Sequence, residues 1–72
     1  MSKQDSVIRI EGLVEESLPS LLFRVKLKNN RIILAYLGGK MSLHRIKVLP
    51  GDKVIVEMPQ ENSERGRIIK RL

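Results

Sequence analysis

Short runs of alternating apolar and polar residues recur along this chain, and they constrain its fold more than any other feature. The clearest is LLFRVKLK at residues 21–28, where Leu21, Phe23, Val25 and Leu27 occupy every second position. Arginine and lysine residues fill most of the positions between them. A period of two places alternate side chains on opposite faces of a strand. This run therefore predicts a β-strand with its apolar set directed inward.

Four other runs predict strands and are separated by turn signals. They lie at residues 6–16, 31–37, 52–58 and 66–72. Gly12 falls inside the first of them and predicts a bulge or a sharp bend. The segments between strands are SLPS at 17–20, a two-residue turn at 29–30, the stretch 38–52 and the polar loop 59–65. The sequence thus predicts five strands, with one irregular connection of about fourteen residues between the third and the fourth.

Five short strands predict a small closed barrel. An open sheet of short, nearly all antiparallel strands would leave one face and two edges exposed to water. Closure removes the edges and brings isoleucine, leucine and valine to the centre. The five-stranded Greek-key barrel, the OB-fold, has its crossover connection between strands three and four. We therefore expect an all-β OB-fold, with a short helical turn in KMSLHRIKV (40–48) and apolar residues of that connection covering the barrel end.

Length and composition exclude several classes of protein. The 72 residues predict one domain, residues 1–72, and the absence of cysteine excludes disulfides and cysteine metal clusters. The one histidine, His44, has no Asp or Cys neighbour at ligand spacing, so we expect no metal and no cofactor. The sequence shows no nucleophile–base arrangement, and GGK at 38–40 lacks the remaining residues of a phosphate-binding P-loop. We therefore expect no catalytic residue and a protein that is not an enzyme.

The sequence also predicts where the protein resides. No apolar run is long enough to span a bilayer, and MSKQDSV at the N-terminus lacks the apolar core of a signal peptide. Together with the lack of cysteine, this predicts a cytoplasmic protein, or one in the stroma if the protein is plastidic. We expect a monomer without a membrane partner.

Positive charge indicates a polyanionic partner. Fourteen basic and eight acidic residues give a formal net charge of +6, and residues 37–72 contribute +4 of it. Small basic domains commonly bind nucleic acid, although such charge can also serve solubility alone.

Of the two aromatic residues, Phe23 alternates with the core set. Tyr36 lies on the outward face of its strand, where it could stack on a base or be an ordinary, partly covered surface residue. One ring cannot form a stacking platform. Binding should therefore depend on lysine and arginine against the phosphates of a folded RNA.

The candidate RNA-binding residues concentrate in the connection and near the C-terminus. Each of them, taken alone, could be an ordinary solvated charge, and the clustering is what indicates a binding surface. Arg24 is one of these candidates, and Lys26 and Arg31 lie on or beside the same sheet face as Arg24. The full set is Arg24, Lys40, His44, Arg45, Lys47, Arg65, Arg67, Lys70 and Arg71.

Several motifs resemble those of bacterial and plastid translation initiation factor one. They are ESLP with FRVKL within residues 16–27, GK at 39–40, VLPGDKV at 48–54 and RGRI at 65–68, and the similarity covers almost the whole chain. The resemblance implies an OB-fold that binds the small ribosomal subunit at the aminoacyl-tRNA site. There the protein would contact small-subunit rRNA and a neighbouring ribosomal protein, and it would work with the second and third initiation factors without turnover.

The resemblance also assigns residues by position. After GKM the family usually has two further basic residues, where this chain has Ser42 and Leu43. Leu43 could face RNA or turn inward to cover the barrel end. Arg45 stands where the family often has an aromatic residue, and Glu61 and Asn62 stand where it usually has YD. The basic residues carried over are Lys3, Arg24, Lys40, Lys47, Arg65, Arg67 and Arg71.

Two other functions are compatible with these residues. One is a general RNA-binding or RNA-chaperone OB-fold domain, which would protect no ribosomal nucleotide reproducibly. The other is a structural subunit of a larger complex, with the outward apolar residues Ile32 and Leu34 as the contact. That function predicts a stable oligomer in the absence of RNA.

Overall fold

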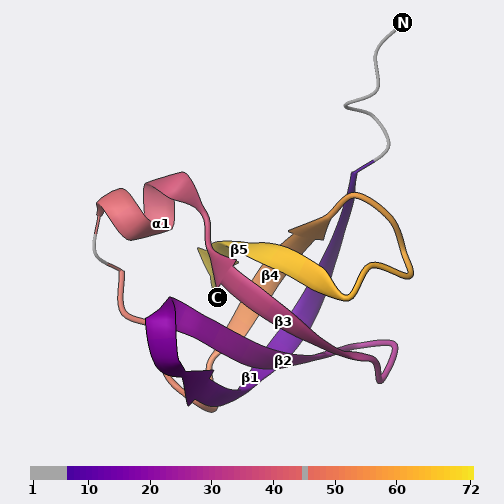
Figure 1. The fold of residues 1–72 in the computed structure, drawn as a ribbon, viewed down its shortest axis with the longest axis horizontal. Helices are drawn as coiled ribbons and strands as arrows, with labels where there is room; N and C mark the ends of the chain where they lie inside the picture. Colours follow the sequence, from indigo (N-terminus) through magenta and orange to yellow (C-terminus); the bar gives the residue numbers. More distant parts are fainter. Residues whose placement is uncertain (1–6, 45) are drawn as a thin grey trace, which may run out of the picture.

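Five β-strands close into a barrel in this computed structural model, which describes residues 7–44 and 46–72 (Figure 1). The strands are β1 (Ile8–Leu18), β2 (Leu22–Leu27), β3 (Ile32–Leu37), β4 (Lys53–Met58) and β5 (Arg65–Arg71). Their order around the barrel is β1-β2-β3-β5-β4, and every pair is antiparallel except β3 with β5. The expected five-stranded OB-fold is confirmed. Lys3 and Arg45 lie outside the described residues.

The interior of the barrel is apolar, as the alternation predicted. Phe23, Val25 and Leu27 of β2 are at most 3% exposed, so the assignment of Phe23 to the core is confirmed. Among the described residues, no polar or charged side chain is buried. The other buried apolar residues are Val14, Ile33, Ala35, Met41, Val48, Val54, Val56, Met58 and Ile68.

Leu21 does not join the core, and the expectation that it points inward is wrong. Its side chain is 63% exposed. The chain turns through a 3-10 segment, η2 (Pro19–Leu21), in which Ser20 and Leu21 have positive φ angles of 65° and 58°. Left-handed backbone interrupts the two-residue period of a strand, so alternation begins only at Leu22.

The bulge in β1 lies next to Glu15 and not at Gly12, so the bulge expected at Gly12 is found three residues later. Gly12 pairs in regular register with Leu27, whereas the register with β2 shifts between Val14 and Glu16. A Cβ atom at Gly12 would lie 2.6 Å from Cγ1 of Val25. Close packing of β1 over the core therefore explains this glycine.

The β2–β3 turn spans residues 28–30, one residue more than expected. The N–H of Asn30 donates to the carbonyl of Leu27 at 2.8 Å, and Asn30 has a φ of 70°. Asparagine tolerates this left-handed conformation better than most residues do. The turn predicted at NN is thus present, and the second asparagine supplies its positive φ.

A five-residue helix, α1 (Gly39–Leu43), opens the connection between β3 and β4 and packs beside β5 (Figure 1). The N–H of Gly38 donates to the carbonyl of Ile68 at 2.8 Å and ties the start of the helix to β5. Met41 and Val48 are 3% and 5% exposed, which confirms that apolar residues of the connection cover the barrel. Leu43 is 76% exposed, so it does not turn inward.

Candidate nucleic-acid interface

A groove between α1 and the end of β5 brings together four of the predicted residues. They are Lys40 and His44 from the helical segment and Lys70 and Arg71 from β5. The groove has a volume of about 510 Å³, and its other lining residues are Met41, Ile46, Ile69 and Leu72. The four basic residues come from segments about 30 positions apart in sequence, which the contact between α1 and β5 brings together.

Arg67 lies beside the same groove. A smaller hollow is lined by Lys40, Met41, Ile69 and Arg67, together with the two glycines at 38 and 39. Lys40, Met41 and Ile69 also line the groove, so the hollow and the groove adjoin each other. We call the surface formed by Lys40, His44, Arg67, Lys70 and Arg71 the α1–β5 surface.

Three predicted residues lie away from the α1–β5 surface. Arg24 and Arg65 flank Leu34 in the register of the sheet, on β2 and β5 respectively, and they line a separate hollow that also includes Arg31. Lys47 is exposed in the connection between α1 and β4. The structure therefore gathers five of the predicted residues and leaves these three apart.

Two of the predicted arginines are held by carboxylates near the ends of strands. The Nε atom of Arg71 lies 3.5 Å from Oδ2 of Asp52, and Nη1 of Arg24 lies 2.5 Å from Oε1 of Glu16. All four side chains are partly exposed to water, between 25% and 50%. Such exposed pairs contribute little to stability, on the order of 0–1 kcal/mol. A phosphate can therefore compete with either carboxylate for its arginine.

Five other predicted residues are free of this competition. Across residues 7–44 and 46–72, no ion pair is formed by Lys40, His44, Lys47, Arg65 or Lys70. All five are exposed residues. Lys40 and Lys70 belong to the α1–β5 surface, which therefore presents two ammonium groups that no carboxylate of the described residues pairs with.

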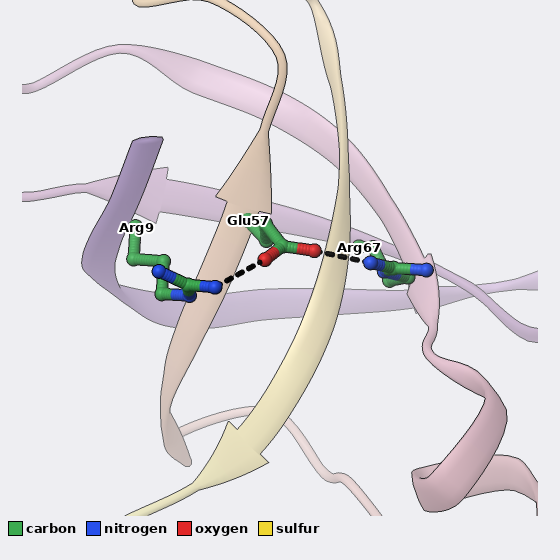
Figure 2. A network of polar contacts seen from close by, with 3 residues as sticks. All are labelled: Arg9, Glu57 and Arg67. Carbon is green, nitrogen blue, oxygen red and sulfur yellow. Dashed lines mark hydrogen bonds and ion pairs between the residues drawn. The ribbon is translucent and has the colours of Figure 1, made fainter. Parts of the chain in front are cut away.

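Glu57 joins two arginines across three strands (Figure 2). Nη2 of Arg9 on β1 lies 3.0 Å from Oε2 of Glu57 on β4, and Nη2 of Arg67 on β5 donates to Oε1. The side chain of Glu57 is 12% exposed, against 59% for Arg9 and 47% for Arg67. The hydrogen bond from Arg67 lowers the pKa of Glu57; the positive charges of both arginines act in the same direction, and desolvation opposes them. The same carboxylate raises the pKa of Arg67.

Arg9 and Glu57 were not among the residues predicted to form the site. In the sequence each is an ordinary polar position in an alternating run. Their partnership depends on the register of the sheet, in which Arg9 lies opposite Glu57 and Glu57 lies opposite Arg67. The spacing within one strand does not determine register against strands about 10 and 50 residues away. The one available signal is that Glu57 is an outward carboxylate in a chain with excess positive charge.

Tyr36 is the exposed aromatic residue of the barrel surface. Its side chain is 48% exposed, and it lies next to Arg67 in the parallel register of β3 and β5. Tyr36 and Arg67 line one hollow together with Glu57 and Pro59. The outward position predicted for Tyr36 is therefore confirmed, and its ring is accessible from solvent.

Neither a cluster of metal-ligating side chains nor a helix able to cross a membrane is found in the part of the chain that the structure describes. Within that part, no three His, Cys, Asp or Glu side chains come together in a way that could hold a metal ion. Over the same residues, no helix has both the length and the apolar character needed to cross a bilayer.

The chain matches known proteins over most of its length. A family model described as Translation initiation factor 1A / IF-1 matches residues 3–72. The solution structure of translation initiation factor one from the Wolbachia endosymbiont strain TRS of Brugia malayi is 40% identical, with a TM-score of 0.77 over 99% of this chain and 84% of that chain. The crystal structure of YjeQ from Thermotoga maritima is 32% identical, with a TM-score of 0.71 over 90% of this chain and 23% of that chain.

Proposed function

This chain belongs to the Translation initiation factor 1A / IF-1 family, and from that membership we propose that it binds the small ribosomal subunit at the aminoacyl-tRNA site through ribosomal RNA. A role in translation initiation follows from the family itself. The position on the subunit and the residues that make the contact are the proposal.

The observation that best supports this proposal is the α1–β5 surface. Basic side chains from two separate elements meet along one groove, and three of them have no ion-pair partner among the described residues. Lysine and arginine contacts to phosphates position a protein on folded RNA without reading its base sequence. A groove bordered by such cations suits the phosphate backbone of a structured decoding region. We assign the main contact to this surface, with Arg24, Lys47 and Arg65 as peripheral contacts.

Further partners follow from the same proposal. We propose contacts with a ribosomal protein that lies beside the decoding site, and joint action with the second and third initiation factors. The protein would act as one domain and as a monomer, by occupying a site and without chemical turnover. Its compartment would be that of its ribosomes, the cytoplasm or the plastid stroma.

Chemical footprinting of purified bacterial small ribosomal subunits tests the proposal. The protein should protect a small, reproducible set of nucleotides at the decoding site. The double variant Lys40→Ala/Lys70→Ala should not give this protection at a concentration at which the unaltered chain saturates the subunits. Lys28→Ala is the matched control, because Lys28 lies in the β2–β3 turn and pairs with Glu11 at 3.8 Å. Protection scattered over the subunit, or none, would favour a general RNA-binding domain instead.

A further inference from the structure

We propose that Glu57 is a positioning residue, which holds the guanidinium group of Arg67 in place for an RNA phosphate on the α1–β5 surface. The proposal rests on the proposed function, because it assigns a role within the same surface. Arg67 and Glu57 are in direct contact, whereas RNA would meet only the arginine. A long arginine side chain that is already ordered loses less conformational entropy when it binds.

The geometry around Glu57 restrains both partners of the pair. Figure 2 shows Arg9 and Arg67 approaching the carboxylate from opposite sides, with β4 between β1 and β5. Each carboxylate oxygen is committed to a different arginine, and Arg9 is only 3.0 Å from Oε2. Because Arg9 holds one oxygen, Glu57 cannot rotate freely, and the other oxygen keeps a defined direction toward Arg67. The nearly buried carboxylate therefore fixes the more exposed guanidinium.

Arg67 keeps donors for a second acceptor. The contact with Glu57 uses Nη2. A guanidinium has five N–H groups in a planar fork, so the groups on Nε and Nη1 can still donate to phosphate oxygens. Arg67 is 47% exposed and shares the hollow next to the groove with Lys40. The pair thus leaves a charged, oriented donor set on the α1–β5 surface.

Charge alone predicts the opposite effect of Glu57 on binding. Arg9, Glu57 and Arg67 together have a formal charge of +1, and Glu57→Gln would raise it to about +2 and increase attraction to RNA. If Glu57 only neutralised Arg67, the substitution would tighten binding. If Glu57 positions Arg67, the substitution weakens binding although the surface becomes more positive. The sign of the change therefore separates the two roles.

The binding test uses the full chain and purified bacterial small ribosomal subunits at two salt concentrations. We expect Glu57→Gln to weaken binding roughly three- to tenfold, the scale for ordering one long side chain. In an Arg67→Ala background the same substitution should leave binding unchanged or tighten it. Glu11→Gln is the control, because Glu11 pairs loosely with Lys28 at 3.8 Å away from the surface, and it should not weaken binding. Urea unfolding confirms that each variant is folded at the assay temperature.

A second readout does not depend on the ribosome. In the free, unaltered protein, ¹⁵N relaxation of the Nε–H group of Arg67 should show an ordered side chain. The Nε–H group of Arg65, on the same strand, should show a mobile side chain. Equal mobility of the two would contradict the positioning role whatever the binding data show. Tighter binding by Glu57→Gln in both backgrounds would overturn the role and leave the proposed function intact. Failure of the unaltered chain to bind subunits would overturn the proposed function, and the RNA contact of Arg67 with it.

Discussion

Leu43 is the most exposed apolar residue that the structure describes in the connection. Neither Leu43 nor its neighbour Ser42 carries a charge, and both residues are exposed to solvent. Because Leu43 is 76% exposed, Leu43→Lys should change the free energy of unfolding by no more than about 0.5 kcal/mol. If the connection faces RNA, the added charge should tighten binding to small subunits and steepen its log–log salt dependence by roughly 0.7–0.9. Unfolding curves and binding titrations at two salt concentrations measure both effects.

Ser42→Lys serves as the neighbouring comparison, since it adds the same charge on the same short helix. Improved binding by either lysine places that position near phosphate. If neither lysine alters binding at low salt, the connection does not lie against RNA. A large loss of stability in Leu43→Lys would show instead that the leucine packs in solution.

Glu57 should make stability depend on pH in the acidic range. Its pKa lies below the usual 4.5 in the folded protein, mainly because Arg67 donates a hydrogen bond to it. The unfolded chain therefore binds the proton more readily, and folding loses this contribution as pH falls below about 4.5 through the lower, folded value. Above that range the contribution is fully present. We expect the stability difference between the unaltered chain and Glu57→Gln, measured by urea unfolding, to shrink from about pH 6 toward pH 3.

A difference that stays constant over this range would mean that the carboxylate titrates alike in both states. Glu61→Gln is a suitable control, because Glu61 is exposed in the β4–β5 loop and forms no ion pair with a described residue. The stability of Glu61→Gln, measured at the same pH values, is the reference against which the Glu57→Gln difference is compared.

At the scale of elements, the strands were predictable and their mutual register was not. Alternation is a local property, so it identified the faces of β2 and the outward position of Tyr36 from the sequence alone. The position of Leu21 was mispredicted because a left-handed turn shifts the start of β2 by one residue. Such a turn cannot be recognised from the spacing of apolar residues. The site shows the same limit: Lys40 and Lys70 were both candidates, but only the docking of α1 on β5 joins them in one groove.

Gly66 tests the packing between β5 and β4. A Cβ atom there would lie 2.5 Å from Cγ1 of Val56 and 3.0 Å from Cγ of Met58, both in the core. Gly66→Ala should therefore overpack the barrel and lower the free energy of unfolding by about 1–3 kcal/mol. Gly39→Ala is the control, because a Cβ at that helical position meets no atom within 4 Å and alanine favours the helix. Equal losses in both variants would contradict the overpacking mechanism.

At the scale of the whole molecule, residues 37–72 contribute +4 of the net charge of +6, and Lys40, Arg67, Lys70 and Arg71 of that half line the proposed surface. Lys40→Ala and Lys70→Ala should each weaken subunit binding and lower the log–log salt slope by roughly 0.7–0.9, the share of one phosphate contact. Arg24→Ala should change the slope less, because Arg24 is paired with Glu16 and lies outside the groove. Binding titrations across several salt concentrations give the slopes. Weaker binding with an unchanged salt slope would indicate that these lysines support the fold and contact no phosphate. The RNA interface would then lie on another part of the protein.

The attachment of α1 to the barrel has a consequence for motion. β1 is hydrogen-bonded to β2 on one side and to β4 on the other, so its amide protons should exchange with solvent only when the whole barrel opens. α1 has five residues, and one backbone hydrogen bond, from Gly38 to Ile68, ties its start to β5. Its amides should therefore exchange through local openings that leave the strands paired. The segment that presents Lys40 can thus adjust to a surface while the barrel stays rigid, and a bound subunit should appear as slowed exchange in α1 before any change in β1.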